Sequence, residues 1–244
     1  MMQVIKFSII IVTWNEEKTI NITLKSISEQ TYKNYEIIII DNLSNDKTLE
    51  IISKYCLNTM IITEKDRGIY YAMNKGIRYS NSDYLIFLNS GDSFHSQNTL
   101  ERVKNDIDTK SDIVYGDVEI QYRKSKKIIK AKSIENLPYG MICCHQSMII
   151  KRDFMEKNEY NTKYSLVADY DFTYNAYLKN ARFQKLNYVI SNYISNGISD
   201  IRRVYRDSEV LTVAMNYQND PRLKVVINHI LKIIISWTVR YLRG

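Results

Sequence analysis

The chain has 244 residues, a formal net charge of +7 at pH 7, and hydrophobic and charged fractions of 45% and 25%. These fractions are those of a soluble globular protein and exclude an intrinsically disordered chain. The length suffices to bury a core in one large α/β domain or two small ones. The positive charge favours anionic partners such as nucleotides, diphosphate lipids, membrane surfaces or nucleic acid, and does not choose among them.

The N-terminus and the cysteines exclude further classes. An N-terminal apolar run of about six residues without a small-residue cleavage site predicts a first strand and not a signal peptide. No segment is long and uncharged enough to predict a membrane-spanning helix. Cys143, Cys144 and His145 lack zinc-ligand spacing, and three cysteines make no disulfide framework, so we expect free thiols in a reducing cytosol.

The first half of the chain alternates strand and helix patterns. Apolar, β-branched runs predict strands at residues 7–14, 35–41, 60–63 and 84–88. Helical periodicity fills the intervals, at residues 16–30, 46–55 and 68–80. Strands buried on both faces and joined by helices predict a parallel sheet with helices on either side. Ligands bind such sheets beyond the carboxyl ends of the strands.

Candidate binding residues follow each of these four strands. They are Thr13, Asn15, Glu17, Asp41, Asp66, Gly68, Ser90 and Asp92. Any one of them could serve only to form a turn or to cap a helix. Several carboxylates on one rim, however, repel one another unless a cation or the donors of a ligand compensate them. The absence of G-x-G-x-x-G and of G-x-x-x-x-G-K-[ST] disfavours a dinucleotide oxidoreductase or a P-loop phosphotransferase.

The second half is less regular. Strands are predicted at residues 112–122 and 145–154, a hairpin partner at 123–132, and a helix that opens with two acids at 169–181. Long helices fill the remainder after a loop at residues 195–200. The simplest organisation is one domain, residues 1–200, with a C-terminal helical extension, residues 201–244.

Five motifs occur in an order that resembles a known family. They are SIIIVTWNEEKTINITLKSISEQTYKNYEIIIIDNLSNDKT, DRGIYYAMNKGI, YLIFLNSGDSF, HQSMIIKRD and SLVADYDF. They resemble the family 2 glycosyltransferases, in the bacterial branch that builds surface polysaccharides, over roughly residues 6 to 200. The resemblance implies a GT-A fold, which is α/β with a Rossmann-like, mostly parallel sheet flanked by helices. It also implies transfer of a sugar from a nucleotide donor, in most members with inversion.

The resemblance gives the strand-end residues roles in binding the donor. The positions expected to hold the nucleotide, with Asp41 accepting from an N–H of the base, are Thr13, Asn15, Glu17, Asp41, Asp66, Gly68 and Ser90. The LNSGD segment matches a metal motif of the form acid–x–acid–acid, in which Asn89 and Gly91 replace the earlier acids and Asp92 remains. Mn²⁺ or Mg²⁺ takes few protein carboxylates when a diphosphate supplies further oxygens, so Asp92 alone is chemically sufficient.

The acceptor side is carried by fewer residues. Asp169 matches the catalytic base of the family, and its place near a helix N-terminus favours the ionised form. A capping role is the alternative, and Asp171 points elsewhere on the helix, so at most one of the two is the base. His145 and Gln146 precede a strand where the family often lines the acceptor pocket, although a lone histidine is more often structural.

The tail at residues 222–244 predicts an amphipathic helix with a basic row. Lys232 in its middle argues against a span, and three roles stay open: binding at a membrane interface, docking on the catalytic domain, or a homodimer contact. The overall prediction is a metal-dependent inverting glycosyltransferase, cytoplasmic and peripheral at the inner face of the membrane. It would move a hexose or N-acetylhexosamine from a nucleotide-sugar donor, expected to be a UDP-sugar, to a lipid-linked glycan acceptor.

Three other interpretations are weighed against this one. A sugar nucleotidyltransferase usually carries a Gly- and Arg-rich loop after the first strand, which the TWNEE segment lacks. A nucleic-acid-binding module is disfavoured, because the strand ends are acidic and the basic residues are dispersed or lie in the tail. A catalytically inactive relative that binds carbohydrate or nucleotide is permitted by the reduced metal motif.

Overall fold

The computed structural model describes residues 4–55, 58–122, 125–195 and 203–217, together with Ile230, Leu231 and Ile234. The strands are β1 (Phe7–Thr13), β2 (Tyr35–Asp41), β3 (Thr59–Thr63), β4 (Tyr84–Phe87), β5 (Ser93–Phe94), β6 (Ile113–Gln121), β7 (Lys126–Ile129), β8 (Met148–Lys151) and β9 (Phe183–Ile194). The helices are α1 (Ile20–Ser28), α2 (Thr48–Ser53), α3 (Ile69–Tyr79), α4 (Thr99–Asp106), α5 (Arg152–Lys157), α6 (Ala168–Leu178), α8 (Arg203–Asn216) and the 3₁₀ turns η1 (Ile134–Tyr139) and η2 (His145–Ser147).

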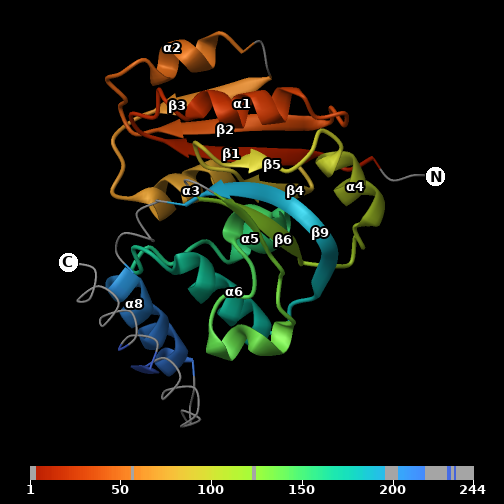
Figure 1. The fold of residues 1–244 in the computed structure, drawn as a ribbon, viewed down its shortest axis with the longest axis vertical. Coiled ribbons are helices and arrows are strands. Elements are labelled where there is room, and N and C mark those ends of the chain that lie inside the picture. The colour runs from red at the N-terminus through yellow and green to blue at the C-terminus, as the bar shows by residue number, and fades with distance from the viewer. Residues whose placement is uncertain are drawn as a thin grey trace.

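The nine described strands form one curved sheet with helices on both faces (Figure 1). The strand order is β3–β2–β1–β4–β8–β6–β9–β5, and β7 pairs with β6. The first four strands of this order are all parallel, as the alternation of strand and helix patterns predicts. From β8 onward antiparallel pairs enter, although β6 and β9 are again parallel. The predicted α/β fold class, a sheet flanked by helices, is thereby confirmed.

The two-residue period of the central strand divides the core. In β1, Ile9 and Ile11 pack into one hydrophobic cluster with α1 and α4, whereas Ile10 packs into a second cluster with α3, α5 and α6. All three isoleucines are fully buried. Successive strand residues point to opposite faces, so a continuous apolar run is what a strand covered on both sides requires.

Some predicted boundaries differ from the structure. Helix α1 begins at Ile20 and not at residue 16, because the N–H groups of Thr19 and Ile20 both bond to the carbonyl of Glu16 and form a turn. This turn leaves Glu16 and Glu17 in the loop after β1. The strand predicted at 145–154 is divided into η2, β8 and α5. Strand β8 ends at Lys151, whose partner Tyr84 is the first residue of β4.

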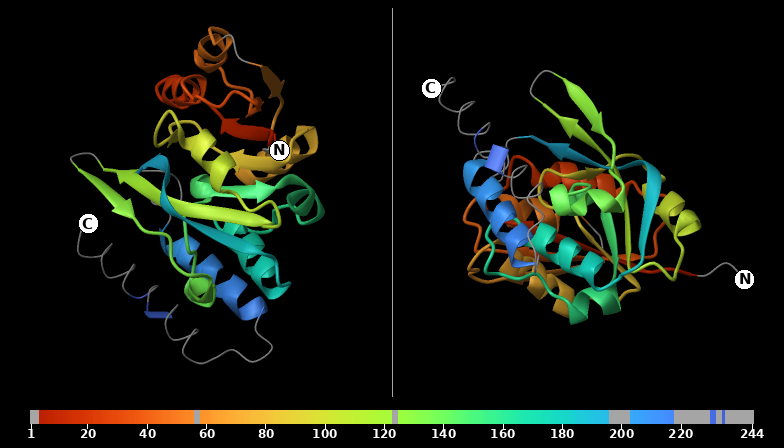
Figure 2. Two further views of the ribbon diagram at one scale, coloured as in Figure 1. Left: turned by 90° about the vertical axis from the view of Figure 1, so that its right-hand side faces the viewer. Right: turned by 90° about the horizontal axis from the view of Figure 1, so that it is seen from below.

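Within the predicted C-terminal helical extension the structure describes α8, which lies beside α6 (Figures 1 and 2). The predicted division after residue 200 falls outside the described residues. So does the amphipathic segment 222–244, except for Ile230, Leu231 and Ile234. Strands β6 and β7 form the predicted hairpin, which projects from the body of the molecule (Figure 2). In the described part of the chain, no helix is long and apolar enough to cross a membrane.

Candidate active site

The parallel register brings the predicted donor residues to one rim. Thr13 at the end of β1 pairs with Asp41 at the end of β2, and Asp41 pairs with Thr63 at the end of β3. Two backbone bonds continue this alignment into the loops, from Asn42 to the carbonyl of Thr13 and from Glu64 to that of Asp41, each 3.0 Å long. The rim is therefore set by sheet register and not by the loops themselves.

The loops after β1 and β2 brace one another. Asn15 has a left-handed φ of 54°, donates its N–H to Ser44 Oγ at 2.8 Å, and accepts the N–H of Asn45 on its side-chain oxygen at 2.9 Å. Glu17 accepts the N–H of Lys47 at 3.1 Å. The Asn15 and Glu17 side chains thus hold the two loops together, a role that the sequence did not indicate. The predicted contact of Asn15 and Glu17 with a nucleotide stays a prediction.

Asp41 is fully buried at the floor of this rim. Its carboxylate accepts two bonds from Ser44, one from the backbone N–H at 3.0 Å and one from the hydroxyl. The hydroxyl of Thr13, its neighbour across the strands, is buried and has no hydrogen-bond partner among the described residues. A buried polar atom without a partner is costly, so a ligand that supplies a donor or acceptor would be favoured here.

Asp66 and Gly68 lie at the start of α3. The buried carboxylate of Asp66 forms an ion pair with Lys75 at 2.7 Å, and Lys75 also pairs with Glu64 at 2.7 Å. Burial lowers the pKa of Lys75, but the bonds that its ammonium donates to Asp66 and Glu64 outweigh burial, so the net effect raises that pKa and the lysine stays charged. Gly68 has a φ of 140°, which only glycine adopts readily, as it turns the chain into α3.

The turn after β4 is fixed from α1. Gly91 has a φ of 96°, and its N–H donates to Thr23 Oγ1 at 2.9 Å. The same hydroxyl donates to the carbonyls of Asp92, at 2.7 Å, and Asn89, at 3.2 Å. Thr23 is fully buried, and sequence reasoning missed it because a threonine on the apolar face of a helix has no local signature. It gives the turn one defined conformation.

This turn presents oxygen atoms that lack partners. Asn89 Oδ1 and Ser90 Oγ are buried without a hydrogen bond to any described residue. Asp92 is 5% exposed, accepts a bond from the Gln146 side chain, and lies near Glu16. Burial raises the pKa of Asp92 to about 8, against the lowering effect of Gln146. A carboxyl group that is costly to ionise beside uncompensated oxygens is what a cation would stabilise.

The donor set fits a hard divalent cation with a small share of protein ligands. Within the described residues, no group of three or more His, Cys, Asp or Glu side chains could hold a metal alone. Asp92 would therefore be the carboxylate ligand, and most remaining ligands would be diphosphate oxygens and water. Mg²⁺ and Mn²⁺ accept such a set, because they prefer oxygen and commonly take one or two carboxylates at phosphate sites.

The 3₁₀ turn η2 joins the two halves of the site. His145 Nε2 lies 3.2 Å from Asn89 Nδ2, and His145 Nδ1 lies 3.8 Å from Asp169 Oδ2. The next residue, Gln146, bonds to Asp92. Burial lowers the pKa of His145, against the opposite effect of Asp169, so the neutral imidazole is favoured. The structure thus brings His145 beside Asn89 and Asp169, and it places Gln146 against Asp92, the expected metal ligand.

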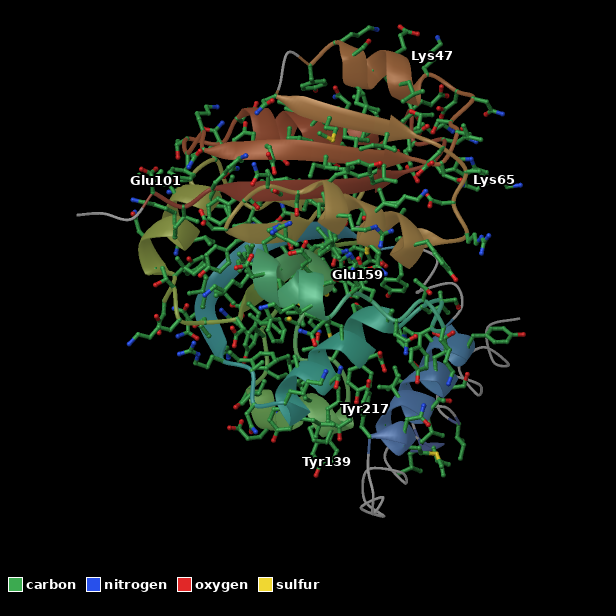
Figure 3. The ribbon with its side chains drawn as sticks, turned by 180° about the vertical axis from the view of Figure 1, so that it is seen from behind. Lys47, Lys65, Glu101, Tyr139, Glu159 and Tyr217 are labelled. Atoms are coloured by element: carbon green, nitrogen blue, oxygen red, sulfur yellow. The ribbon has the colours of Figure 1, made fainter. Side chains whose placement is uncertain are left out.

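Asp169 lies in the first turn of α6 with its side chain 17% exposed. Asp169 Oδ1 accepts the hydroxyl of Tyr70 at 3.0 Å and the N–H of Tyr170 at 2.9 Å. Asp171 is directed elsewhere, as predicted: it is buried and bonds to Tyr217, which lies beside α6 at the end of α8 (Figure 3), and to Asn161. Of these two acids, Asp169 is the one that lies beside His145.

Comparison with known proteins identifies the family of this chain. Residues 8–182 match the family described as Glycosyl transferase family 2. Because the match spans well over half of the chain, this protein belongs to glycosyl transferase family 2. The "PGL/p-HBAD biosynthesis glycosyltransferase" of Mycobacterium bovis (strain BCG / Pasteur 1173P2) is 30% identical over 253 residues, which cover 96% of this chain and 98% of that protein.

Two solved structures share the fold. S. aureus TarS 1-349 in complex with UDP-GlcNAc superposes with a TM-score of 0.70 at 19% identity, over 93% of this chain and 72% of that one. The mannosyltransferase PcManGT from Pyrobaculum calidifontis, in complex with GDP-Man and Mn2+, superposes with a TM-score of 0.69 at 15% identity, over 98% of this chain and 76% of that one. At these identities the likeness concerns the fold alone, and it confirms the predicted GT-A architecture.

Proposed function

We propose that this glycosyltransferase is a metal-dependent, inverting enzyme that moves a hexose or N-acetylhexosamine from a UDP-sugar to a lipid-linked glycan. One observation carries the proposal: the side-chain oxygens of Asn89 and Ser90, which have no partner among the described residues, lie beside Asp92, and η2 connects this turn with Asp169. One short segment, η2, would thus connect the binding site of a diphosphate and its cation with a carboxylate base.

The donor would lie along the rim at the ends of β1, β2 and β4. The predicted base and ribose contacts at Thr13 and Asp41 are supported by the Thr13 hydroxyl, which no described residue bonds, and by the burial of Asp41. UDP-GlcNAc in TarS supports a UDP-sugar, whereas GDP-Man in PcManGT keeps a guanosine donor as the competing outcome of the experiment below. Asp66 and Gly68 at the start of α3 would complete the nucleotide side.

The diphosphate would lie over the turn that follows β4. Ser90 has a small side chain there and Gly91 has none, which permits the diphosphate to approach the backbone closely. Asp92 would be the protein ligand of Mn²⁺ or Mg²⁺, and PcManGT, whose complex holds Mn2+, supports this assignment. When bound, such a cation stabilises the negative charge that develops on the departing diphosphate.

The chemical step would be a single displacement. The acceptor oxygen attacks the anomeric carbon from the face opposite the nucleotide, its proton passes to Asp169, and the bond between that carbon and the diphosphate oxygen breaks with its electron pair leaving on UDP. Asp169 is partly exposed in the first turn of a helix, which suits a base that must meet a substrate hydroxyl. His145, beside Asp169 and Asn89, would border the acceptor hydroxyl.

The acceptor and the cellular location are supported by charge. A net charge of +7 favours an acceptor with an anionic diphosphate-lipid group and a membrane surface that carries anionic lipids. Exposed lysines on the hairpin β6–β7, among them Lys127, add basic surface on an element that projects from the body (Figure 2). We therefore place the enzyme at the cytosolic face of the membrane, with the tail at 222–244 as a second contact or as a homodimer contact.

The experiment is a nucleotide-release assay on the full chain with Mn²⁺. UDP-GlcNAc, UDP-glucose, UDP-galactose and GDP-mannose are supplied with an undecaprenyl-diphosphate-linked sugar or with water as acceptor. Release of UDP from one UDP-sugar, accelerated by the lipid-linked acceptor and abolished by EDTA, supports the proposal. Release of GDP instead would change the donor, and formation of a UDP-sugar from UTP and a sugar phosphate would replace the proposal with nucleotidyl transfer. No turnover with any of them favours a non-catalytic binding protein.

A further inference from the structure

The catalytic assignment of Asp169 leaves open which of its two oxygens receives the proton. Oδ1 already accepts two hydrogen bonds, from the Tyr70 hydroxyl at 3.0 Å and from the Tyr170 N–H at 2.9 Å. Oδ2 has His145 Nδ1 as its neighbour at 3.8 Å, which is too long for a hydrogen bond. The two oxygens of one carboxylate therefore differ, and the difference is made largely by a side chain 99 residues away in sequence.

The Tyr70 hydroxyl also contacts the backbone of the same residue. It accepts the N–H of Asp169 while it donates to Asp169 Oδ1. One phenol thus holds both the main chain and the carboxylate of the first turn of α6. Such a two-point contact restricts rotation of the carboxylate in a way that one bond would not.

The Tyr70 ring is itself held rigidly. It is 8% exposed and packs against Tyr160 with ring centroids 5.3 Å apart, and Tyr160 packs against Phe87 of β4 and Phe172 of α6 at 5.4 and 5.6 Å. Asn74, one turn further along α3, binds the backbone of Tyr160 through two bonds, of 2.8 and 3.0 Å. The aromatic cluster fixes where the hydroxyl points.

Helix α3 also begins at the nucleotide side of the site. Its first turn follows Asp66 and Gly68, which the proposed function assigns to the donor, and Tyr70 is the second residue of the helix. Burial and the neighbouring Asp169 raise the pKa of Tyr70 well above its usual value, so the phenol remains a donor throughout the working pH range. A single helical turn thus reaches from the donor rim to the base.

We propose that Tyr70 is a positioning residue that occupies Oδ1 of Asp169, so that Oδ2 is the oxygen that accepts the proton of the acceptor hydroxyl. This inference rests on the proposed function of Asp169. In the reaction, the acceptor O–H bond breaks, its proton joins Oδ2, the acceptor oxygen bonds to the anomeric carbon, and the electron pair of the cleaved carbon–oxygen bond leaves with UDP. Tyr70 gives up no proton and keeps its bond to Oδ1 throughout.

The first measurement titrates Asp169 directly by carboxyl ¹³C NMR on the ligand-free full chain, with the Asp169→Asn spectrum as the assignment. The titratable side chains that face Asp169 are Tyr70, Tyr160, His145 and Cys143, and all are retained in the comparison except the phenol under test. A hydrogen bond donated to a carboxylate favours its ionised form, so Tyr70→Phe, which removes such a bond, is expected to move the titration of the Asp169 carboxyl to higher pH.

The matched control is Tyr71→Phe, the same change on the next residue, whose side chain is 37% exposed on α3. It is expected to leave the titration of Asp169 unchanged. Equal titrations in wild type and in Tyr70→Phe would overturn the proposal. If Tyr70→Phe fails to fold, wild-type protein labelled with 3-fluorotyrosine, a stronger hydrogen-bond donor, is expected to lower the pKa of Asp169, and no change there would also overturn it.

The second measurement is the rate of UDP release from UDP-GlcNAc with water as acceptor, as a function of pH. Tyr70→Phe is expected to lower kcat about tenfold and to shift the acidic limb of the pH–rate profile to higher pH. The affinity for UDP should stay unchanged. Activity retained by Asp169→Asn would contradict the proposed base itself. An inactive Asp169→Asn together with a Tyr70→Phe that behaves as wild type would contradict only the role of Tyr70.

Discussion

The proposed donor side and the proposed acceptor side of this site are built in different ways. The donor side is the row of loops after parallel strands, where register alone aligns Thr13 with Asp41. The acceptor side is assembled from separate elements: Tyr70 on α3 meets Asp169 on α6, and Asn89 meets His145 across 56 residues of sequence. Sheet topology thus fixes the first side, whereas tertiary packing fixes the second.

This difference has a consequence for sensitivity to change. Alteration of the packing around α6 should impair the chemical step and leave nucleotide binding intact, because α6 packs mainly against η1 and α8. Alteration of the turn after β4, which Thr23 of α1 holds, should weaken nucleotide binding as well as turnover, because this turn carries the proposed metal ligand Asp92. The predictions below separate binding from chemistry on each side.

The largest effect is expected at Asp169. Asp169→Asn keeps the shape of the side chain but removes the base, so kcat should fall by about 10²–10⁴-fold, the usual contribution of a general base. UDP affinity, measured by calorimetry, should change by less than about twofold. A twofold change in affinity corresponds to about 0.4 kcal/mol. Steady-state UDP release from the donor identified above is the measurement.

Asp171→Asn is the matched control two residues along the same helix. Its carboxyl group is buried and bonds to Tyr217 and Asn161, so this change should lower the melting temperature more than kcat. If Asp171→Asn lost activity as strongly as Asp169→Asn while remaining folded, the assignment of the base would be wrong.

A smaller effect is expected at the contact between α8 and the segment that leads into α6. Glu209 accepts the N–H of Ser165 at 3.1 Å, its hydroxyl at 2.9 Å, and the N–H of Leu166 at 2.9 Å. Glu209→Ala should lower kcat by about tenfold, equal to about 1.4 kcal/mol, because this segment positions Asp169. UDP affinity should not change.

The control for Glu209 is Ser208→Ala on the same helix. The Ser208 hydroxyl donates to the carbonyl of Tyr205, within the helix, and its loss should leave kcat as in wild type. A Glu209→Ala variant that weakens UDP binding as much as kcat would show that the two sides are not separable.

A separate prediction concerns stability and pH instead of catalysis. Burial raises the pKa of Asp92 from its usual 3.8 to about 8, so the folded protein binds a proton there that the unfolded chain releases above pH 4. The free energy of unfolding of the metal-free protein should therefore fall as pH rises from about 4 toward 8, and Asp92→Asn should remove this dependence. Denaturant melts in EDTA at pH 5 and pH 8 are the measurement, and parallel shifts in both proteins would contradict it.

The sequence predicted the donor side better than the acceptor side for the same physical reason. Strands β1, β2 and β4 are visible as apolar runs, and residues after parallel strands share one rim, so the pattern of residues alone places Asp41 and Asp92 together. Tyr70 resembles one more packing tyrosine in the sequence, because its contact with Asp169 depends on how α3 and α6 pack. Gln146 was expected at the acceptor, yet it bonds to Asp92, which only the path of η2 determines.

Two further elements escaped prediction for local reasons. Helix α4 has only two large apolar residues, Leu100 and Val103, and its N-cap residue Asn98 makes no side-chain capping bond. Strand β5 is only two residues long and is defined by pairing with β9. Neither carries a predicted site residue, so the expected functional arrangement did not depend on them.

The central claim is that Asp92 holds a cation with which a nucleoside diphosphate binds. The most direct measurement is calorimetric titration of UDP into wild type and into Asp92→Asn, each with Mn²⁺ and with EDTA. Wild type is expected to bind UDP at least about tenfold more tightly with Mn²⁺ than with EDTA, a difference of about 1.4 kcal/mol, and Asp92→Asn is expected to lose this gain. Equal Mn²⁺-dependent binding by both proteins would contradict it.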